Sequence, residues 1–274
     1  MDAVVERVVG AFLDAVDASA PGLVEGLYLV GSVALGDFRP HESDVDFVVV
    51  SARRLEVTAE SALAKVHAGL GARSDLPPFE GVYLTWQDLA CSPAACPGTP
   101  YACDGVFHAR GDFAVDPVTW HQLAHYGLAC RGPAVEEFDV WTDPDVLAAW
   151  TRANLDGYWR RWRERHRRLF TRPGWDALRG DTAAWGVLGV SRLHFTLATG
   201  GFTSKTGAGA YALEAFPARW HRVLTECSRV RRGETSAGWG RGAFARRREA
   251  LDFMAMVIED GQGVGGGSPH DLSG

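Results

Sequence analysis

Apolar positions follow two kinds of spacing along the first half of the chain. An opening helix is predicted by apolar residues at helical spacing: Val5, Val9, Phe12 and Val16. Short apolar runs over residues 27–30, 47–50 and 81–86 predict three buried strands. A helical pattern over residues 63–71 lies between the last two runs. Alternating strands and helices are typical of an α/β domain, so we expect a mixed sheet with flanking helices over residues 1–142.

The second half of the chain has a different pattern. Asp143-Pro144 is typical of a helix start, with Asp as the cap and Pro at the first helical position. Further helices are predicted over residues 185–199, 218–230 and 243–259. We therefore expect an all-α helical bundle over residues 143–260.

Two segments lack a clear periodic pattern. Residues 91–117 are rich in Pro, Gly and Cys, and we interpret them as a loop with one strand near Val106-Phe107. Residues 261–274 are rich in Gly and are predicted to be a disordered tail.

Composition narrows the class of protein. The 274 residues are 46% hydrophobic and 23% charged, which is ordinary for a globular protein. A formal net charge of −6 does not favour a nucleic-acid binder, and we interpret the arginine-rich segment 159–172 as the charged face of a helix. The first residues resemble no signal peptide, and no run is long enough to span a membrane. We therefore expect a cytoplasmic monomer without membrane or nucleic-acid partners.

The five cysteines indicate no metal site. Cys91, Cys96 and Cys103 are close in sequence, but their spacing matches no common zinc pattern. An odd number of cysteines is compatible with free thiols in a reducing compartment.

Candidate chemistry is concentrated around the first two predicted strands. Gly31-Ser32 follows the first strand, where backbone N–H groups and a hydroxyl can hold phosphate oxygens. Asp44 and Asp46 stand two residues apart at the head of the second strand, so both carboxylates point to one side. Paired carboxylates on a rigid strand favour Mg²⁺ shared with substrate phosphates. The alternative is an ordinary turn beside a polar strand end, but the joint pattern favours nucleoside triphosphate chemistry.

This joint pattern resembles a known superfamily. Gly31-Ser32, then Gly36, then Asp44-Val45-Asp46 is similar to the motif of the polymerase-β-like nucleotidyltransferases. More narrowly, residues 31–47 resemble the aminoglycoside nucleotidyltransferases that adenylylate streptomycin and spectinomycin. Further stretches that resemble this family are 79–82, 131–137, 191–193 and 199–205.

The resemblance implies a role for each matching residue. It implies that Asp44 and Asp46 bind magnesium and that Glu80 is the base for the attacking hydroxyl. It implies a nucleotide-binding role for a wider set: Gly31, Ser32, Ser43, Arg192 and Lys205. Lys205 is one of only two lysines in the chain, and its charge suits phosphate.

Two departures leave the substrates open. Arg231 stands where the family has an aromatic residue near the nucleotide. The region between Phe107 and Phe113 lacks the Trp of streptomycin-modifying members, and Asp181 is one residue away from their helical-domain acid. Spectinomycin or another hydroxyl-rich cation remains possible as the acceptor.

The sequence thus predicts transfer of AMP from ATP to a hydroxyl of an aminoglycoside-type antibiotic. The partners implied are ATP, Mg²⁺ and a cationic, hydroxyl-bearing small molecule. Two alternatives stay open: a nucleotidyltransferase for another acceptor, such as a protein or a biosynthetic intermediate, and a non-catalytic nucleotide-binding protein of the same fold.

Overall fold

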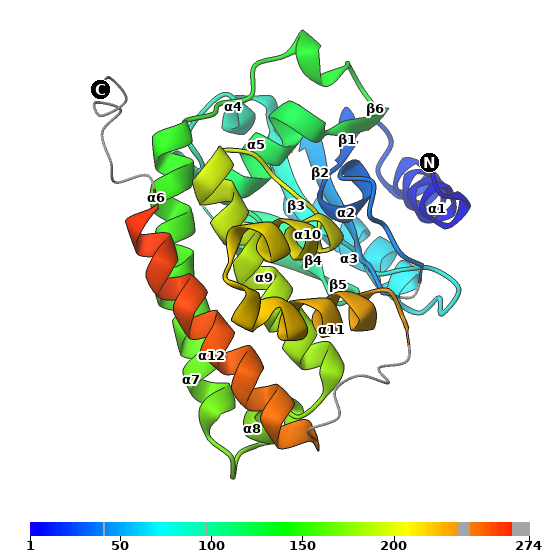
Figure 1. Cartoon of the computed structure of the whole chain (residues 1–274). Helices are drawn as coiled ribbons and strands as arrows, with labels where there is room; N and C mark the ends of the chain where they lie inside the picture. Colours follow the sequence, from blue (N-terminus) through cyan, green and yellow to red (C-terminus); the bar gives the residue numbers. More distant parts are fainter. Residues whose placement is uncertain (41, 97, 235–241, 265–274) are drawn as a thin grey trace, which may run out of the picture. The chain divides into compact units, whose positions relative to one another are not determined.

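The computed structural model describes residues 1–40, 42–96, 98–234 and 242–264 (Figure 1). The chain divides into two compact units, Met1–Asp143 and Pro144–Gly274, and each has its own hydrophobic core. None of the described helices is both long enough and apolar enough to cross a membrane.

Unit 1 is built on a six-stranded mixed sheet. Its strands are β1 (Gly26–Leu29), β2 (Val45–Ser51), β3 (Phe79–Thr85), β4 (Thr99–Cys103), β5 (Val106–Gly111) and β6 (Leu128–Arg131). They lie in the order β5-β4-β3-β2-β1-β6. The β2–β3 pair is parallel and the other pairs are antiparallel. The predicted mixed sheet with flanking helices is confirmed.

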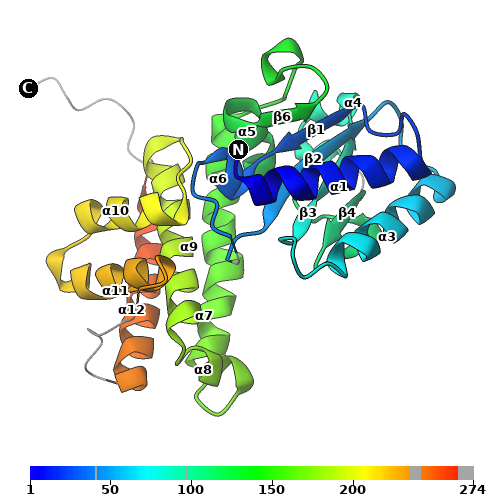
Figure 2. The same ribbon diagram turned by 90° about the vertical axis from the view of Figure 1, so that its right-hand side faces the viewer.

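Helices cover both faces of this sheet. They are α1 (Ala3–Ser19), α2 (Gly31–Ala34), α3 (Val57–Gly71), α4 (Trp86–Leu89) and α5 (Pro117–Tyr126), with short 3₁₀ turns at Pro93–Ala95 and Val135–Glu137. The helices α1 and α3 pack side by side on one face (Figure 2). That face takes Leu27, Phe47 and Val49, whereas Tyr28 and Val48 belong to the opposite cluster, which includes residues of α4 and α5. Successive side chains of a strand therefore pack into the hydrophobic clusters on opposite faces of the sheet.

The interpretation of residues 91–117 as a loop with one strand was wrong in part. A strand at Val106 is present, but β4 precedes it and pairs with both β3 and β5. The hairpin turn holds Asp104 at φ 52° and Gly105 at φ 72°. Asp-Gly is a frequent hairpin turn because both residues tolerate positive φ. The Asp104-Gly105 pair was therefore the sequence signal from which the β4–β5 hairpin could have been predicted.

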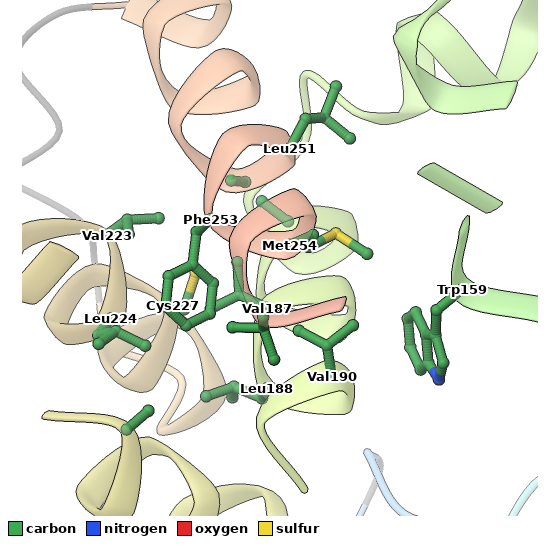
Figure 3. Packing of buried hydrophobic residues seen from close by; sticks show 14 of the residues in the cluster. Trp159, Val187, Leu188, Val190, Val223, Leu224, Cys227, Leu251, Phe253 and Met254 are labelled. Atoms are coloured by element: carbon green, nitrogen blue, oxygen red, sulfur yellow. The ribbon is translucent and has the colours of Figure 1, made fainter. Parts of the chain in front are cut away.

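Unit 2 is helical, as predicted. Its elements are α6 (Pro144–Asn154), a π-helical turn (Leu155–Trp159), α7 (Arg160–Arg167), α8 (Arg172–Asp176), α9 (Gly180–Thr199), α10 (Lys205–Ala215), a 3₁₀ turn (Ala218–Trp220), α11 (His221–Arg231) and α12 (Gly242–Gly263). The central helix α9 packs against α10, α11 and α12. Figure 3 shows Val187 and Leu188 of α9 beside the ring of Phe253 of α12, with Leu224 of α11 on the far side of that ring. The left-handed Gly200, at φ 71°, ends α9.

The predicted disordered tail begins too early in the chain. Helix α12 continues through Gly261 to Gly263, because Gly261 is buried against Leu155 and Leu197 and a helix tolerates glycine where packing holds it. Residues 265–274 lie outside the described residues.

Candidate active site

The turn after β1 links three elements of unit 1. Gly31 adopts φ +60°, a left-handed conformation that favours glycine, and opens the short helix α2. Its N–H donates to Gln122 Oε1 of α5 over 3.0 Å. The Ser32 hydroxyl donates to the backbone oxygen of Asp44 over 3.4 Å. The turn is therefore fixed to α5 on one side and to the head of β2 on the other.

Asp46 lies directly against this turn. The N–H of Val30 donates to the Asp46 backbone oxygen over 3.0 Å. The Asp46 carboxylate packs on the Cα of Gly31, where the Cβ of any other residue would overlap it. Since side chains alternate along β2, Asp44 and Asp46 share the face of Val48 and Val50, which is the face covered by α5.

Glu80 is the strand neighbour of Asp46. In the parallel β2–β3 register the two residues are direct partners. Glu80 has the same parity along β3 as Val82, whose side chain belongs to the α5 face. The predicted turn, the Asp pair and the predicted base therefore meet at one end of the two central strands.

The surroundings of Glu80 favour a basic carboxylate. Burial raises the pKa of Glu80, and the negative charge of Asp44 raises it further. The backbone N–H of Asp104 opposes this by donating to Glu80 Oε1 over 2.9 Å. A carboxylate with a raised pKa is a stronger proton acceptor than an ordinary glutamate, which suits a general base.

The hairpin turn between β4 and β5 holds Glu80 in place. Besides the Asp104 N–H, the Cys103 thiol donates to Glu80 Oε2 over 3.6 Å. Burial and the neighbouring carboxylates raise the pKa of Cys103 to about 12, so the thiol keeps its proton near neutral pH. In the described part of the chain, the ligand atoms of Glu80, Cys103 and Asp104 all lie within 4.8 Å of one another.

The donor set at the strand ends fits magnesium. Asp44 and Asp46 offer carboxylate oxygens, the ligands that Mg²⁺ prefers. The charge of Asp44 raises the pKa of Glu80, which shows that the carboxylates repel one another and that a cation would relieve the repulsion. A thiol is a poor magnesium ligand, so Cys103 is not part of this donor set.

Ser43 has a local structural contact. It is buried, and its hydroxyl accepts a hydrogen bond from the N–H of Arg39 over 3.1 Å. The N–H of Ser43 in turn donates to the oxygen of Arg39 over 3.0 Å. These bonds fix the loop that leads into Asp44.

Arg192 and Lys205 lie close together within unit 2. Arg192 Nε donates to the oxygen of Thr203 over 3.1 Å, just before α10. Lys205 is the first residue of α10, after the cap Ser204, whose hydroxyl accepts from the N–H of Gly207. The positive end of a helix dipole thus coincides with two cationic side chains, which is a favourable environment for phosphate.

Two family models match the chain, one in each unit. The model described as nucleotidyltransferase domain matches residues 10–79. The model described as aminoglycoside adenylyltransferase, C-terminal domain, matches residues 171–256. The chain is an aminoglycoside nucleotidyltransferase. The first match contains Gly31, Asp44 and Asp46 but ends one residue before Glu80.

A search of solved structures agrees with this fold. The chain is similar to the spectinomycin adenyltransferase AAD(9) from Enterococcus faecialis, whose crystal structure contains ATP and spectinomycin. The TM-score is 0.66 at 14% sequence identity, over 91% of this chain and 99% of that chain. No curated protein sequence matches this aminoglycoside nucleotidyltransferase.

Sequence reasoning missed the residues that position the site. Gln122 lies on α5, which was not predicted, although Asp116-Pro117 has the same cap pattern as Asp143-Pro144. The contacts of Cys103 and Asp104 with Glu80 depend on the β3–β4 pairing, which no local pattern indicated.

Proposed function

We propose that this enzyme transfers AMP from ATP to a hydroxyl of an aminoglycoside-type antibiotic, with spectinomycin or a streptomycin-like molecule as the acceptor. The acceptor oxygen attacks the α-phosphorus of ATP, the bond from that phosphorus to the α–β bridging oxygen breaks, and pyrophosphate leaves. The observation that carries this proposal is the register of β2 and β3, which pairs Asp46 with Glu80 beside the Gly31 turn.

The nucleotide is bound through its phosphates. Ser32 and the N–H groups that follow Gly31 hold phosphate oxygens, while the Gly31 N–H stays bonded to Gln122 and Ser43 keeps the loop before Asp44 in place. Asp44 and Asp46 would hold Mg²⁺, which when bound neutralises phosphate charge and favours displacement at the α-phosphorus. Arg192 and Lys205 supply positive charge for the triphosphate, since the carboxylate site cannot.

Glu80 accepts the proton of the attacking hydroxyl. An alcohol is a weak nucleophile, so removal of its proton in the transition state assists attack. The bond from the Asp104 N–H orients the carboxylate, and burial strengthens it as a base.

The acceptor is held by a pocket in unit 2. A cavity of about 510 Å³ is lined by Trp162, His166, Asp176, Arg179, Asp181, Thr182 and Trp185. Carboxylates and indole rings together suit a protonated amino sugar, through ion pairing and cation–π contact. Five of its seven lining residues, all except Trp162 and His166, lie in the part of the chain that matches the aminoglycoside adenylyltransferase C-terminal domain, and AAD(9) was crystallised with spectinomycin.

We also infer that the enzyme works as a monomer in the cytoplasm. Its five cysteines are all free, which suits a reducing compartment where ATP is abundant.

Pyrophosphate release tests the proposal. The purified enzyme is incubated with ATP, Mg²⁺ and one aminoglycoside at a time, and the acceptor is weighed by mass spectrometry. We expect acceptor-dependent pyrophosphate and an acceptor heavier by one AMP residue, with spectinomycin among the substrates. Reactions without acceptor and with Asp44→Asn enzyme are the controls. Pyrophosphate release with a protein or biosynthetic acceptor, and none with any aminoglycoside, would contradict the proposed acceptor class.

A further inference from the structure

The pocket in unit 2 contains a cationic residue that the proposed function does not use. Arg179 lies at the cap position of α9, two residues before Asp181. Its Nε contacts Asp181 Oδ1 at 3.0 Å and its Nη2 contacts Asp181 Oδ2 at 2.5 Å. Both oxygens of the Asp181 carboxylate are therefore engaged by one guanidinium, the strongest geometry for such a pair.

The surrounding contacts fix Asp181 further. The N–H of Thr182 donates to Asp181 Oδ1 over 2.7 Å. The guanidinium of Arg246, on α12, donates to the oxygen of Leu178 and so anchors the loop that carries Arg179. The hydrogen bonds from Arg179 hold the pKa of Asp181 below its usual range, so this carboxylate is ionised and paired.

Asp176 is in a different state. Among the described residues, the Asp176 carboxylate makes no ion pair within 4 Å. His166 adds no charge at neutral pH, because burial lowers its pKa. Its Nδ1 lies 2.8 Å from the oxygen of Trp162, so Nδ1 carries the proton and Nε2 is a neutral acceptor. The pocket therefore has two carboxylates and one guanidinium. Arg179 pairs directly with Asp181 and acts on Asp176 only through its charge at longer range, so among the described pocket residues Asp176 is the carboxylate without an ion pair.

The aromatic residues complete a site for a compact ring. Trp162 and Trp185 lie with ring centroids 5.4 Å apart, and His166 stacks on Trp162. Trp162 is buried, whereas Trp185 is partly exposed at the edge of the cavity. The apolar faces of the indoles can contact the ring of an aminocyclitol while its amine meets Asp176.

We propose that Arg179 determines acceptor specificity: by pairing with Asp181 it leaves the pocket one free carboxylate, and it thereby favours compact acceptors with few amino groups over polycationic aminoglycosides. This inference rests on the proposed function only for the identity of the pocket as the acceptor site. A polycation has to displace Arg179 from Asp181 and also lies beside its positive charge, whereas a compact cation binds Asp176 without disturbing the pair.

Direct binding without ATP tests the inference. Spectinomycin and neomycin, a polyamine, are titrated into the full chain by calorimetry, with the change in intrinsic tryptophan fluorescence as a second readout. Arg179→Gln should tighten neomycin binding by about three- to tenfold, because an exposed pair is released and a repulsive charge is removed. Spectinomycin binding should change less, by no more than about twofold, because this ligand does not displace the Arg179–Asp181 pair and the charge of Arg179 acts on Asp176 only at longer range.

The matched control is Arg160→Gln. Arg160 is also in unit 2, pairs with Asp156 over 2.8 Å and lies outside the pocket, so this variant changes the net charge equally. If Arg160→Gln tightens neomycin as much as Arg179→Gln does, the effect is one of overall charge and the inference is overturned. In an Asp181→Asn background, Arg179→Gln should tighten neomycin binding by no more than half as much as in the wild-type background. An undiminished tightening would also overturn the inference.

The two proposals fail in different ways. If the wild-type enzyme transfers AMP to no aminoglycoside, yet Arg179→Gln shifts neomycin binding selectively, the proposed function fails and the charge role of Arg179 stands. If the wild-type enzyme adenylylates spectinomycin and Arg179→Gln binds both ligands as the wild type does, the function stands and Arg179 has no role in specificity.

Discussion

The carboxylate of Asp46 packs on the backbone of Gly31 so closely that a Cβ at position 31 would come within 1.9 Å of Asp46 Oδ2. Gly31→Ala should therefore displace Asp46 and abolish turnover. Because Gly31 also has φ +60°, the substitution should cost about 1–2 kcal/mol of unfolding free energy. Turnover and chemical denaturation are measured on the same preparation.

Gly36 provides a matched control for this prediction. It has a similar φ of +67°, but a Cβ there would meet no atom within 4 Å. Gly36→Ala should lose a similar amount of stability and keep its activity. If both variants lose activity equally, backbone strain in the loop explains the loss, and the contact with Asp46 does not.

Local patterns predicted the strands of this site but not its assembly. The apolar runs located β1, β2 and β3, and the spacing of Asp44 and Asp46 gave their common face. The pairing of Asp46 with Glu80 is set by a parallel register across 34 residues of chain, which is a tertiary property. The bond from Gly31 to Gln122 spans 91 residues and is equally invisible to local reasoning.

In the second half of the chain, too, local patterns predicted helix ends but not the features that depend on tertiary packing. Gly200 and the Asp143-Pro144 pair marked helix ends through local chemistry, and both predictions agree with the bounds of α9 and α6. Helix α10 was missed, because its glycine-rich sequence has a weak helical preference and is stabilised by packing of Ala208 and Gly209 in the bundle. The pocket beside Asp181 depends on three helices and could not be located from sequence.

The magnesium ligands can be tested by isosteric substitution. Asp44→Asn and Asp46→Asn each remove a charged ligand and keep the side-chain shape, so turnover should fall on the order of 10³-fold or more. Unfolding without metal should need at least as much denaturant as for the wild type, because repulsion between neighbouring carboxylates is relieved. Asp156→Asn, in unit 2, is the control and should be active. Near-normal turnover of either variant would remove the metal site from the mechanism.

Lys205 should act on phosphate and not on the nucleoside. Lys205→Ala removes a cation at the start of α10 and should weaken ATP binding by about 10–100-fold, the range for a hydrogen bond to a charged group. Binding of adenosine should not change. The only other lysine, Lys65, is exposed on α3, and Lys65→Ala should bind both ligands normally. Calorimetry that finds equal losses for ATP and adenosine would contradict a phosphate contact.

His67 should make unit 1 sensitive to acid. Its ring stacks on Phe47 and its Nε2 lies 2.6 Å from the Tyr83 hydroxyl, and burial lowers its pKa from 6.5 to about 4. Between these two values the unfolded chain binds the proton and the folded chain does not, so stability falls as the pH falls through this window. The shift corresponds to about 3 kcal/mol between pH 6.5 and pH 4.

Denaturation at a series of pH values checks this prediction. His67→Gln keeps a polar partner for Tyr83 but has no proton to gain, so its unfolding free energy should fall less steeply over the same window. Parallel curves for the two proteins would show that other groups cause the acid sensitivity. The comparison uses the slope with pH, so any loss of packing in the variant does not affect it.

Substitution of Glu80 tests whether the residue paired with Asp46 across β2 and β3 is the general base. If Glu80 is the general base, Glu80→Gln should bind ATP and magnesium almost as the wild type does but lose turnover by about 10²–10⁴-fold, the usual contribution of a positioned base. The loss should appear in kcat and not in nucleotide affinity, because the proton is accepted in the transition state. Asp104→Ala is a demanding control, since the bond from residue 104 to Glu80 Oε1 comes from the backbone N–H and survives the substitution. Asp104→Ala should therefore keep most of its activity.

If Glu80 only supports the hairpin through its contacts with Cys103 and Asp104, Glu80→Gln will be nearly silent, because a glutamine can accept the same hydrogen bond. A near-normal kcat for Glu80→Gln with the best acceptor would exclude Glu80 as the base.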